Sequence, residues 1–82
     1  MLGFRILNQR LTILLAKRVR NGELTERGLS RMTGISQPHI HNVLKGKRFL
    51  STVTADAILQ ELHLDVLDLL DPRELLEWRQ RC

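Results

Sequence analysis

Apolar residues recur at steps of three and four along most of the chain, which is the spacing of one face of an α-helix. In the first segment this spacing predicts a helix over residues 4–20. Asn21 and Gly22 are expected to end it, because both residue types tolerate the left-handed conformation found at helix ends. The inward positions of this helix are expected to be Phe4, Leu7, Leu11, Leu14 or Leu15, and Val19.

Two short helices are predicted next, over residues 26–33 and 37–45. Thr25 and Ser36 precede them, and a hydroxyl side chain at that place can accept a hydrogen bond from a free N–H group of the first turn. Gly34 separates the two helices and suits a tight turn that needs a positive φ angle. The inward positions are expected to be Leu29, Ser30 and Met32, followed by Ile40, Val43 and Leu44.

Three further helices are predicted in the second half of the chain. Ser51 or Thr54 is expected to cap one that runs to about residue 62, with inward positions at Val53, Ala57, Ile58 and Leu62. A short helix follows over 65–70, and another over 72–80. No segment alternates in the manner of a β-strand, and 82 residues are too few for a second core. We therefore expect an all-α fold of five to six helices in one small domain.

Charge is distributed unevenly along the sequence. Residues 1–48 contain ten Lys or Arg and two Glu, a formal charge of +8, whereas residues 49–82 contain three Arg and seven Asp or Glu, a charge of −4. A chain divided in this way is expected to fold with one basic face. A basic face of this kind is expected in a protein that binds a polyanion.

Residues 26–44 combine the features of a helix-turn-helix. The first short helix carries Ser30, which is small where the second helix must approach closely, and Gly34 follows in the turn. The stretch LTERGLSRMTGISQPHIHNVLKGKR resembles the helix-turn-helix of the lambda-repressor-like DNA-binding domains, also described as Cro/repressor-type or XRE-like. Residues 51–70 resemble the helices that follow in that family, so the resemblance covers about residues 4–70.

The resemblance implies a double-stranded DNA-binding domain over residues 1–70, with residues 71–82 as an additional C-terminal helix. In that family the third helix enters the major groove and its first residues touch base edges. Gln and Asn side chains can pair with adenine, and His can donate to guanine. The resemblance assigns base contacts to Gln37, Pro38, His39 and Asn42. It assigns contacts with the DNA backbone to Thr25, Arg27, Ser36, His41, Lys45, Lys47 and Arg48.

The sequence departs from the family pattern in two respects. Glu26 stands where the family usually has a Gln in contact with phosphate, and a carboxylate would repel that group. Thr25, Arg27 or the amide groups of the helix would have to supply the contact instead. Val19 and Leu44 are apolar where many members have an Arg–Glu pair, which is reasonable because a buried ion pair often gives no net stability.

His39 and His41 are two residues apart, so on a helix their side chains point about 200° from each other. They therefore cannot form one metal site by themselves, and the chain lacks the Cys and His clusters typical of zinc sites. We expect neither a metal nor a cofactor. Arg5 and Arg10 of the first helix fit two interpretations, solvated surface residues or contacts with DNA.

A second cluster, Leu75, Leu76 and Trp78, lies in the last predicted helix. It either closes the core of the monomer or forms the contact of a homodimer, because members of the resembled family commonly pair through this end of the domain. A symmetric dimer would hold two recognition helices about 34 Å apart, one turn of DNA, on a palindromic site.

These observations predict a sequence-specific transcriptional regulator, a repressor of phage or bacterial type that blocks polymerase without catalysis. The alternative is an interaction module, the antitoxin-like half of a toxin–antitoxin pair, which binds both DNA and a protein partner. An enzyme is not expected, since no paired carboxylates, no nucleophile with a base and no phosphate-cradling glycine loop occur.

No export signal or membrane segment is expected, because the apolar run LTILLA at 11–16 is too short for either. Cys82 has no second cysteine with which to form an internal disulfide, so the chain needs no oxidising compartment. We expect a cytoplasmic protein that does not enter a membrane.

Overall fold

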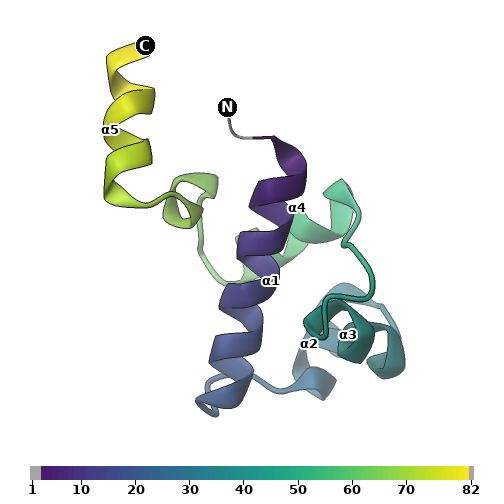
Figure 1. Ribbon diagram of the computed structural model, residues 1–82. Coiled ribbons are helices and arrows are strands. Elements are labelled where there is room, and N and C mark those ends of the chain that lie inside the picture. Colours follow the sequence, from purple (N-terminus) through teal and green to yellow (C-terminus); the bar gives the residue numbers. More distant parts are fainter. Residues whose placement is uncertain (1–2, 82) are drawn as a thin grey trace.

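Helices make up all the regular secondary structure in the computed structural model, which describes residues 3–81 apart from the side chains of Val66, Trp78 and Arg81. The elements are α1 (Phe4–Arg20), α2 (Glu26–Thr33), α3 (Gln37–Leu44), α4 (Thr52–Glu61), the 3₁₀ helix η1 (Val66–Leu69) and α5 (Pro72–Arg81). Figure 1 shows α1 in the middle, with α2 and α3 on one side of it and α5 on the other. The predicted all-α fold is confirmed.

Local side-chain caps explain where α2, α3 and α4 begin. The hydroxyl of Thr25 accepts from the backbone N–H of residue 28 at 2.9 Å, Ser36 accepts from that of residue 39 at 3.4 Å, and Ser51 accepts from that of residue 54 at 3.2 Å. Each bond satisfies an N–H group that has no partner inside its helix. The glycines after α1, α2 and α3 have φ angles of 79°, 74° and 78°, at Gly22, Gly34 and Gly46. The predicted caps and stops are therefore confirmed.

Two element predictions differ in detail from the structure. α3 ends at Leu44, one residue earlier than predicted, because Lys45 already belongs to the closing turn and Gly46 takes the positive φ angle. The segment predicted as a helix over 65–70 is a single 3₁₀ turn. Asp65 and Asp68 hold it by reciprocal hydrogen bonds, in which each carboxylate accepts a backbone N–H at the start of the turn.

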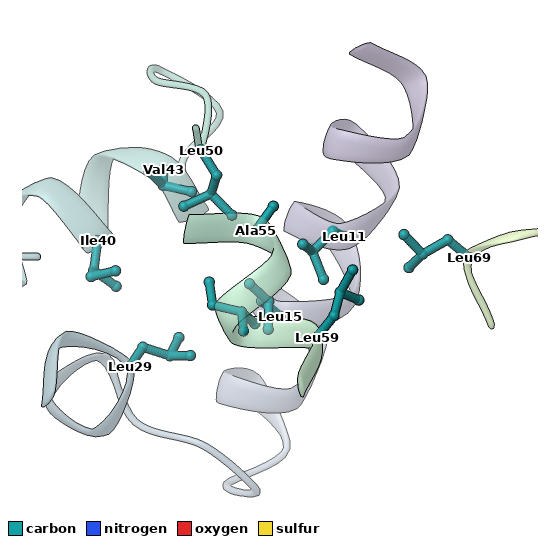
Figure 2. Packing of buried hydrophobic residues seen from close by; sticks show 10 residues of the cluster. Leu11, Leu15, Leu29, Ile40, Val43, Leu50, Ala55, Leu59 and Leu69 are labelled. Carbon is teal, nitrogen blue, oxygen red and sulfur yellow. The ribbon is translucent and has the colours of Figure 1, made fainter. Parts of the chain in front are cut away.

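The hydrophobic core collects residues from every part of the fold between α1 and η1. Figure 2 shows Leu11 and Leu15 of α1 beside side chains of α4, with Leu29, Ile40 and Val43 approaching from α2 and α3. Because α1 contacts both α3 and η1, its two buried leucines connect the α2–α3 side of the core with η1. The buried apolar residues are Leu11, Leu15, Leu29, Ile40, Val43, Leu50, Ala55, Ile58, Leu59 and Leu69.

Two residues predicted to face inward are exposed instead. Phe4 is 49% exposed and Val53 is 80% exposed. The inward face of α4 is formed by Ala55, Ile58 and Leu59, which follow the three- and four-residue spacing, and on a helix Val53 points about 200° away from Ala55. The prediction was wrong for Val53 because it lies on the opposite side of α4 from the packed face, and wrong for Phe4 because it is the first residue of α1 and is left partly uncovered.

A buried amide joins α1 to the segment between α3 and α4. The Nδ2 group of Asn8 donates to the carbonyl oxygen of Leu50 at 2.8 Å, and the backbone N–H of Leu50 donates to Oδ1 of Asn8 at 3.4 Å. Leu50 is itself buried, so its peptide group cannot turn to water. Asn8 therefore fixes the end of residues 45–50, which we call the basic loop because it contains Lys45, Lys47 and Arg48.

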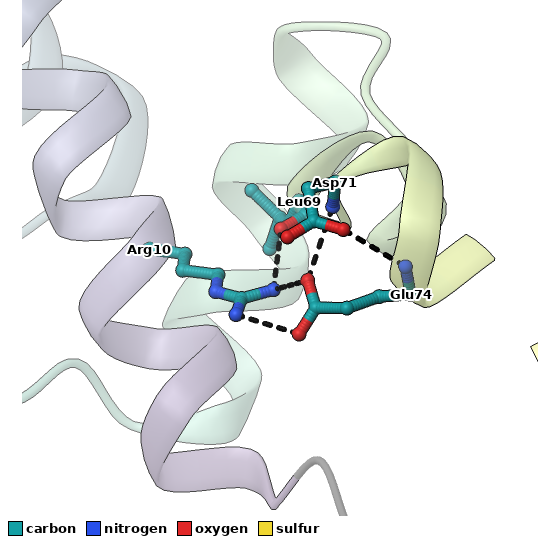
Figure 3. Close-up of polar contacts among 4 residues, drawn as sticks. All are labelled: Arg10, Leu69, Asp71 and Glu74. Carbon is teal, nitrogen blue, oxygen red and sulfur yellow. Dashed lines mark hydrogen bonds and ion pairs between the residues drawn. The ribbon is translucent and has the colours of Figure 1, made fainter. Parts of the chain in front are cut away.

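An ion pair holds the start of α5 against α1. The guanidinium group of Arg10 binds both carboxylate oxygens of Glu74 and also donates to the carbonyl oxygen of Leu69 at 3.2 Å (Figure 3). Asp71 caps α5 by accepting from the backbone N–H of Glu74 at 2.8 Å, and its own N–H donates to Glu74 at 3.1 Å. These contacts lower the pKa of Glu74 from 4.5 to about 2. The largest effect comes from the hydrogen bond with Arg10, and the next largest comes from the hydrogen bond with the backbone of Asp71.

We expect Asn8→Ala to lower the free energy of unfolding by about 3 kcal/mol, because it leaves the buried N–H and C=O groups of Leu50 without partners. The matched control is Gln9→Ala, since Gln9 is the exposed neighbour of Asn8 on the same helix. It should change stability by less than about 0.5 kcal/mol. Urea denaturation of both variants measures the difference, and equal losses would contradict the role assigned to Asn8.

We expect the stabilising effect of Glu74, compared with Glu74→Gln, to depend on pH. A carboxylate whose pKa is lowered in the folded state contributes fully above its ordinary value of 4.5, and the contribution is lost as the pH falls through about 2. The difference in thermal midpoint between the wild type and Glu74→Gln should therefore shrink over this interval. A difference that stays constant from neutral pH to the acid limit would contradict the prediction.

Candidate nucleic-acid interface

The turn between α2 and α3 is closed by hydrogen bonds of its own residues. The hydroxyl of Ser30 donates to the carbonyl oxygen of Ile35, and the N–H of Gly34 donates to the carbonyl oxygen of Ser30 at 2.9 Å. The hydroxyl of Thr33 accepts from the N–H of Ile35 at 3.2 Å. Ser30 is thus useful for its hydroxyl group as well as for the small size that the sequence indicated. These bonds, together with the positive φ of Gly34, fix the direction in which α3 leaves α2.

One face of α3 is buried and the opposite face is directed outward. Ile40 and Val43 belong to the core. Of the residues predicted to contact bases, Gln37 and Pro38 are exposed, while His39 and Asn42 are half-buried. Within the described part of the chain, the side chains of these predicted contact residues make no hydrogen bonds. Their polar groups therefore remain available to an external partner.

The N-termini of α2 and α3 each carry one of the hydroxyl groups predicted to contact the DNA backbone. Thr25 and Ser36 are exposed, and each uses its oxygen to accept a backbone N–H as a cap. A hydroxyl that accepts in this way still has its own hydrogen to donate. Arg27, in the first turn of α2, is also exposed. Free N–H groups and hydroxyl donors at a helix start are suited to bind an anion such as phosphate.

Glu26 contacts His41, a pairing that the sequence did not reveal. One carboxylate oxygen of Glu26 lies 2.9 Å from Nδ1 of His41, so the start of α2 is beside the middle of α3. From the sequence, Glu26 was expected only to repel phosphate, and His41 was expected to contact the DNA backbone independently of it. Residues fifteen positions apart on different helices form no local pattern, so only the turn geometry brings them together.

The basic loop follows α3 directly and presents its charged side chains to solvent. Lys45, Lys47 and Arg48 are exposed. The loop leaves α3 through two backbone hydrogen bonds, from Gly46 N–H to the carbonyl oxygen of residue 43 at 3.0 Å and from Lys47 N–H to that of Asn42 at 2.9 Å. The hydrogen bonds with Asn8 hold its other end. The predicted phosphate-binding residues of the loop therefore sit on a segment that is fixed at both ends.

An open hollow of about 510 Å³ lies between α1 and the basic loop. Its apolar lining includes Ile13 and Phe49, which are both exposed, and its charged lining includes Arg20 and Arg48. Arg5 of α1 lies over the ring of Phe49, with the guanidinium carbon 5.7 Å from the ring centre, which is a cation–π distance. Basic groups of α1 thus extend the positive surface of the loop.

Arg10 and the last helix lie on the other side of α1. Arg10, for which two interpretations were open, binds Glu74 at the start of α5. Among the residues predicted as dimer or partner contacts, Leu76 is 57% exposed and Leu75 is half-buried. The side chain of Trp78 lies outside the described part of the structure. Leu76 therefore presents an apolar surface on α5.

Among the described residues, no three or more His, Cys, Asp or Glu side chains are placed together so that they could hold a metal ion. Over the same part of the chain, no helix combines the length and the apolar character needed to cross a membrane.

Comparisons of the chain with protein-family models, curated proteins and solved structures gave no match. The function must therefore be argued from the residues themselves and from their arrangement.

Proposed function

We propose that this chain is a sequence-specific double-stranded DNA-binding transcriptional regulator, built as a lambda-repressor-like helix-turn-helix domain and acting as a repressor of phage or bacterial type. The observation that carries the proposal is the continuous arrangement of α3 and the basic loop. α3 buries its apolar face and leaves Gln37 and Asn42 without side-chain partners in the described structure, and the loop adds Lys47 and Arg48 immediately after it. This arrangement supports a helix that reads bases and a loop that binds phosphates.

In this proposal the outward face of α3 enters the major groove. Gln37 and Asn42 carry amide groups, which can pair with the N6 and N7 groups of adenine through two hydrogen bonds. His39 can donate to guanine, and Pro38 offers an apolar surface to a thymine methyl group. These contacts give the sequence preference.

The basic loop and the two helix starts supply the contacts with the DNA backbone. Lys45, Lys47 and Arg48 neutralise phosphates, while Thr25 and Ser36 donate their hydroxyl hydrogens. Contacts of this kind position a protein on the duplex and do not read sequence. They also release counterions, so binding should weaken steeply as the salt concentration rises.

Repression would follow from occupation of an operator, without catalysis. We propose a homodimer in which α5, through Leu75, Leu76 and Trp78, contacts a second copy of the chain. Two copies related by twofold symmetry would read two half-sites about 34 Å apart. A palindromic target is the expected consequence.

The second candidate is an antitoxin-like module that binds DNA and also a protein partner. The specific observation in its favour is Leu76, which is exposed on a helix attached to α1 through the Arg10–Glu74 pair. An apolar residue in that position fits a protein surface as well as it fits a second copy. Co-purification of a second small protein would favour this candidate over the homodimer.

Selection of bound sequences from a random duplex library tests the proposal directly. We expect the survivors to share one short motif, present twice at a spacing of about one turn of DNA. Survivors without any common motif would contradict sequence-specific regulation. Failure to retain any duplex, even at low salt, would contradict DNA binding itself.

We expect Gln37→Ala and Asn42→Ala to relax specificity, each costing about 1–3 kcal/mol on the selected duplex and little on random DNA. Arg48→Ala should instead weaken binding to both duplexes alike and reduce the slope of the salt dependence by about 1. Arg73→Ala is the matched control, because Arg73 is an exposed arginine on α5, away from α3. Equal losses on both duplexes for all the variants would contradict the roles assigned to these residues.

A further inference from the structure

Glu26 and His41 form the one side-chain ion pair between α2 and α3 in the described part of the chain. The distance from Oε2 of Glu26 to Nδ1 of His41 is 2.9 Å. The side chain of His41 is 50% exposed and that of Glu26 is 28% exposed, so solvent or a ligand can still reach the histidine ring. The pair lies on the flank of α3, beside the face that we propose to enter DNA.

The contact determines which nitrogen of His41 carries hydrogen. An ionised carboxylate can only accept hydrogen bonds, so Nδ1 must be the protonated nitrogen where it faces Glu26. In a neutral imidazole the other nitrogen, Nε2, is then an acceptor. An acceptor cannot bind a phosphate oxygen, because both atoms offer lone pairs. Protonation of Nε2 turns the same atom into a donor and gives the ring a positive charge.

The net charge of the Glu26–His41 pair also depends on the protonation of His41 in a way that matters for phosphate binding. While His41 is neutral, the carboxylate of Glu26 is an uncompensated negative charge close to the surface that phosphates would approach. Once His41 is protonated, the pair has no net charge, and the exposed nitrogen of the ring donates. Both effects favour an anion only in the protonated state.

We infer that His41 is a phosphate ligand that binds in its protonated form and that Glu26 is its positioning residue, so that binding of duplex DNA takes up about one proton. This inference rests on the proposed DNA-binding function and adds a regulation of that site by pH. DNA affinity should then fall as the pH rises through the range in which histidine loses its charge, between about pH 5 and 8.

Other charged residues occur on α3 and on the two helices packed against it, α1 and α2. On α3 itself, the exposed Lys45 lies one turn further along. On α2, Arg27 follows Glu26 and is exposed. On α1, Arg18 is engaged with Glu23, with 3.9 Å between the charged atoms. Glu26 is the negative group in contact with His41, and an approaching phosphate would add a second.

The test measures the dissociation constant of the selected duplex between about pH 5 and 8, at constant ionic strength. Above the pH at which His41 is neutral in the free protein, uptake of one proton predicts a weakening of about tenfold per pH unit. His41→Gln should abolish this dependence. His63→Asn is the matched control, because His63 is an exposed histidine between α4 and η1 and asparagine tolerates its positive φ angle. This variant should keep the tenfold slope.

Glu26→Gln tests the positioning role separately. The amide of glutamine can donate to Nδ1, which allows the neutral ring to carry its hydrogen on Nε2 and to bind phosphate without proton uptake. This variant should bind more tightly than the wild type near the upper end of the pH range, and its affinity should weaken by clearly less than tenfold per pH unit, because the neutral ring can already donate to phosphate. A merely structural role for Glu26 would lower the thermal midpoint and leave the pH slope unchanged.

The outcomes separate the two proposals. Binding that is independent of pH in the wild type, or a slope that survives in His41→Gln, overturns the inference and leaves DNA binding intact. A wild-type slope in Glu26→Gln overturns the positioning role. Absence of binding to any duplex at every pH overturns the proposed function and the inference together.

Discussion

The paired hydrogen bonds between Asn8 and Leu50 are the constraint on which the proposed DNA-binding side of the molecule depends. Residues 42 positions apart meet in the core, and the side-chain amide matches both polar groups of one buried peptide. An apolar residue in the place of Asn8 would leave these groups unsatisfied, which costs more than it gains from burial. The basic loop and the start of α4 are therefore positioned by one residue of α1.

The structure gives roles to several acidic residues in the second half of the chain, residues 49–82. Asp65 and Asp68 accept backbone N–H groups of η1, Asp71 caps α5, and Glu74 binds Arg10. These carboxylates therefore stabilise turns and helix starts, where negative charge is favourable. In the basic half, Lys45, Lys47 and Arg48 are exposed and lie together after α3. Contacts within the fold account for these four acidic residues, whereas the exposed charges of the basic loop are available to an external anion.

Local features of the sequence were sufficient to predict the five α-helices and to place their ends to within about one residue, although the segment predicted as a helix over 65–70 is a 3₁₀ turn. Thr25, Ser36 and Ser51 act on the next turn of the chain, and Gly34 acts on its own backbone, so each signal can be read within a few residues. The exposed position of Val53 was not predictable in this way. Val53 keeps a four-residue spacing to Ala57, and this spacing alone did not show that the packed face of α4 runs through Ala55, Ile58 and Leu59 instead.

The candidate site was predictable only in part, because local sequence patterns do not reveal contacts between residues that are far apart in the chain. The position of Gln37 and Asn42 away from the core follows from the helical period, since Ile40 and Val43 claim the inward direction. The pairs Asn8–Leu50, Arg10–Glu74 and Glu26–His41 link residues that are 42, 64 and 15 positions apart. Such pairs arise only when the whole chain has folded, so the residues gave no local signal of their partners.

The turn between α2 and α3 closes through Ser30, Thr33 and Gly34, and the described outward side chains of Gln37 and Asn42 take no part in it. The residues that fix the shape of this region are therefore different from the residues that it presents to solvent. Substitutions at the outward positions can therefore change what the helix presents to solvent, one residue at a time, while the scaffold beneath them keeps its shape.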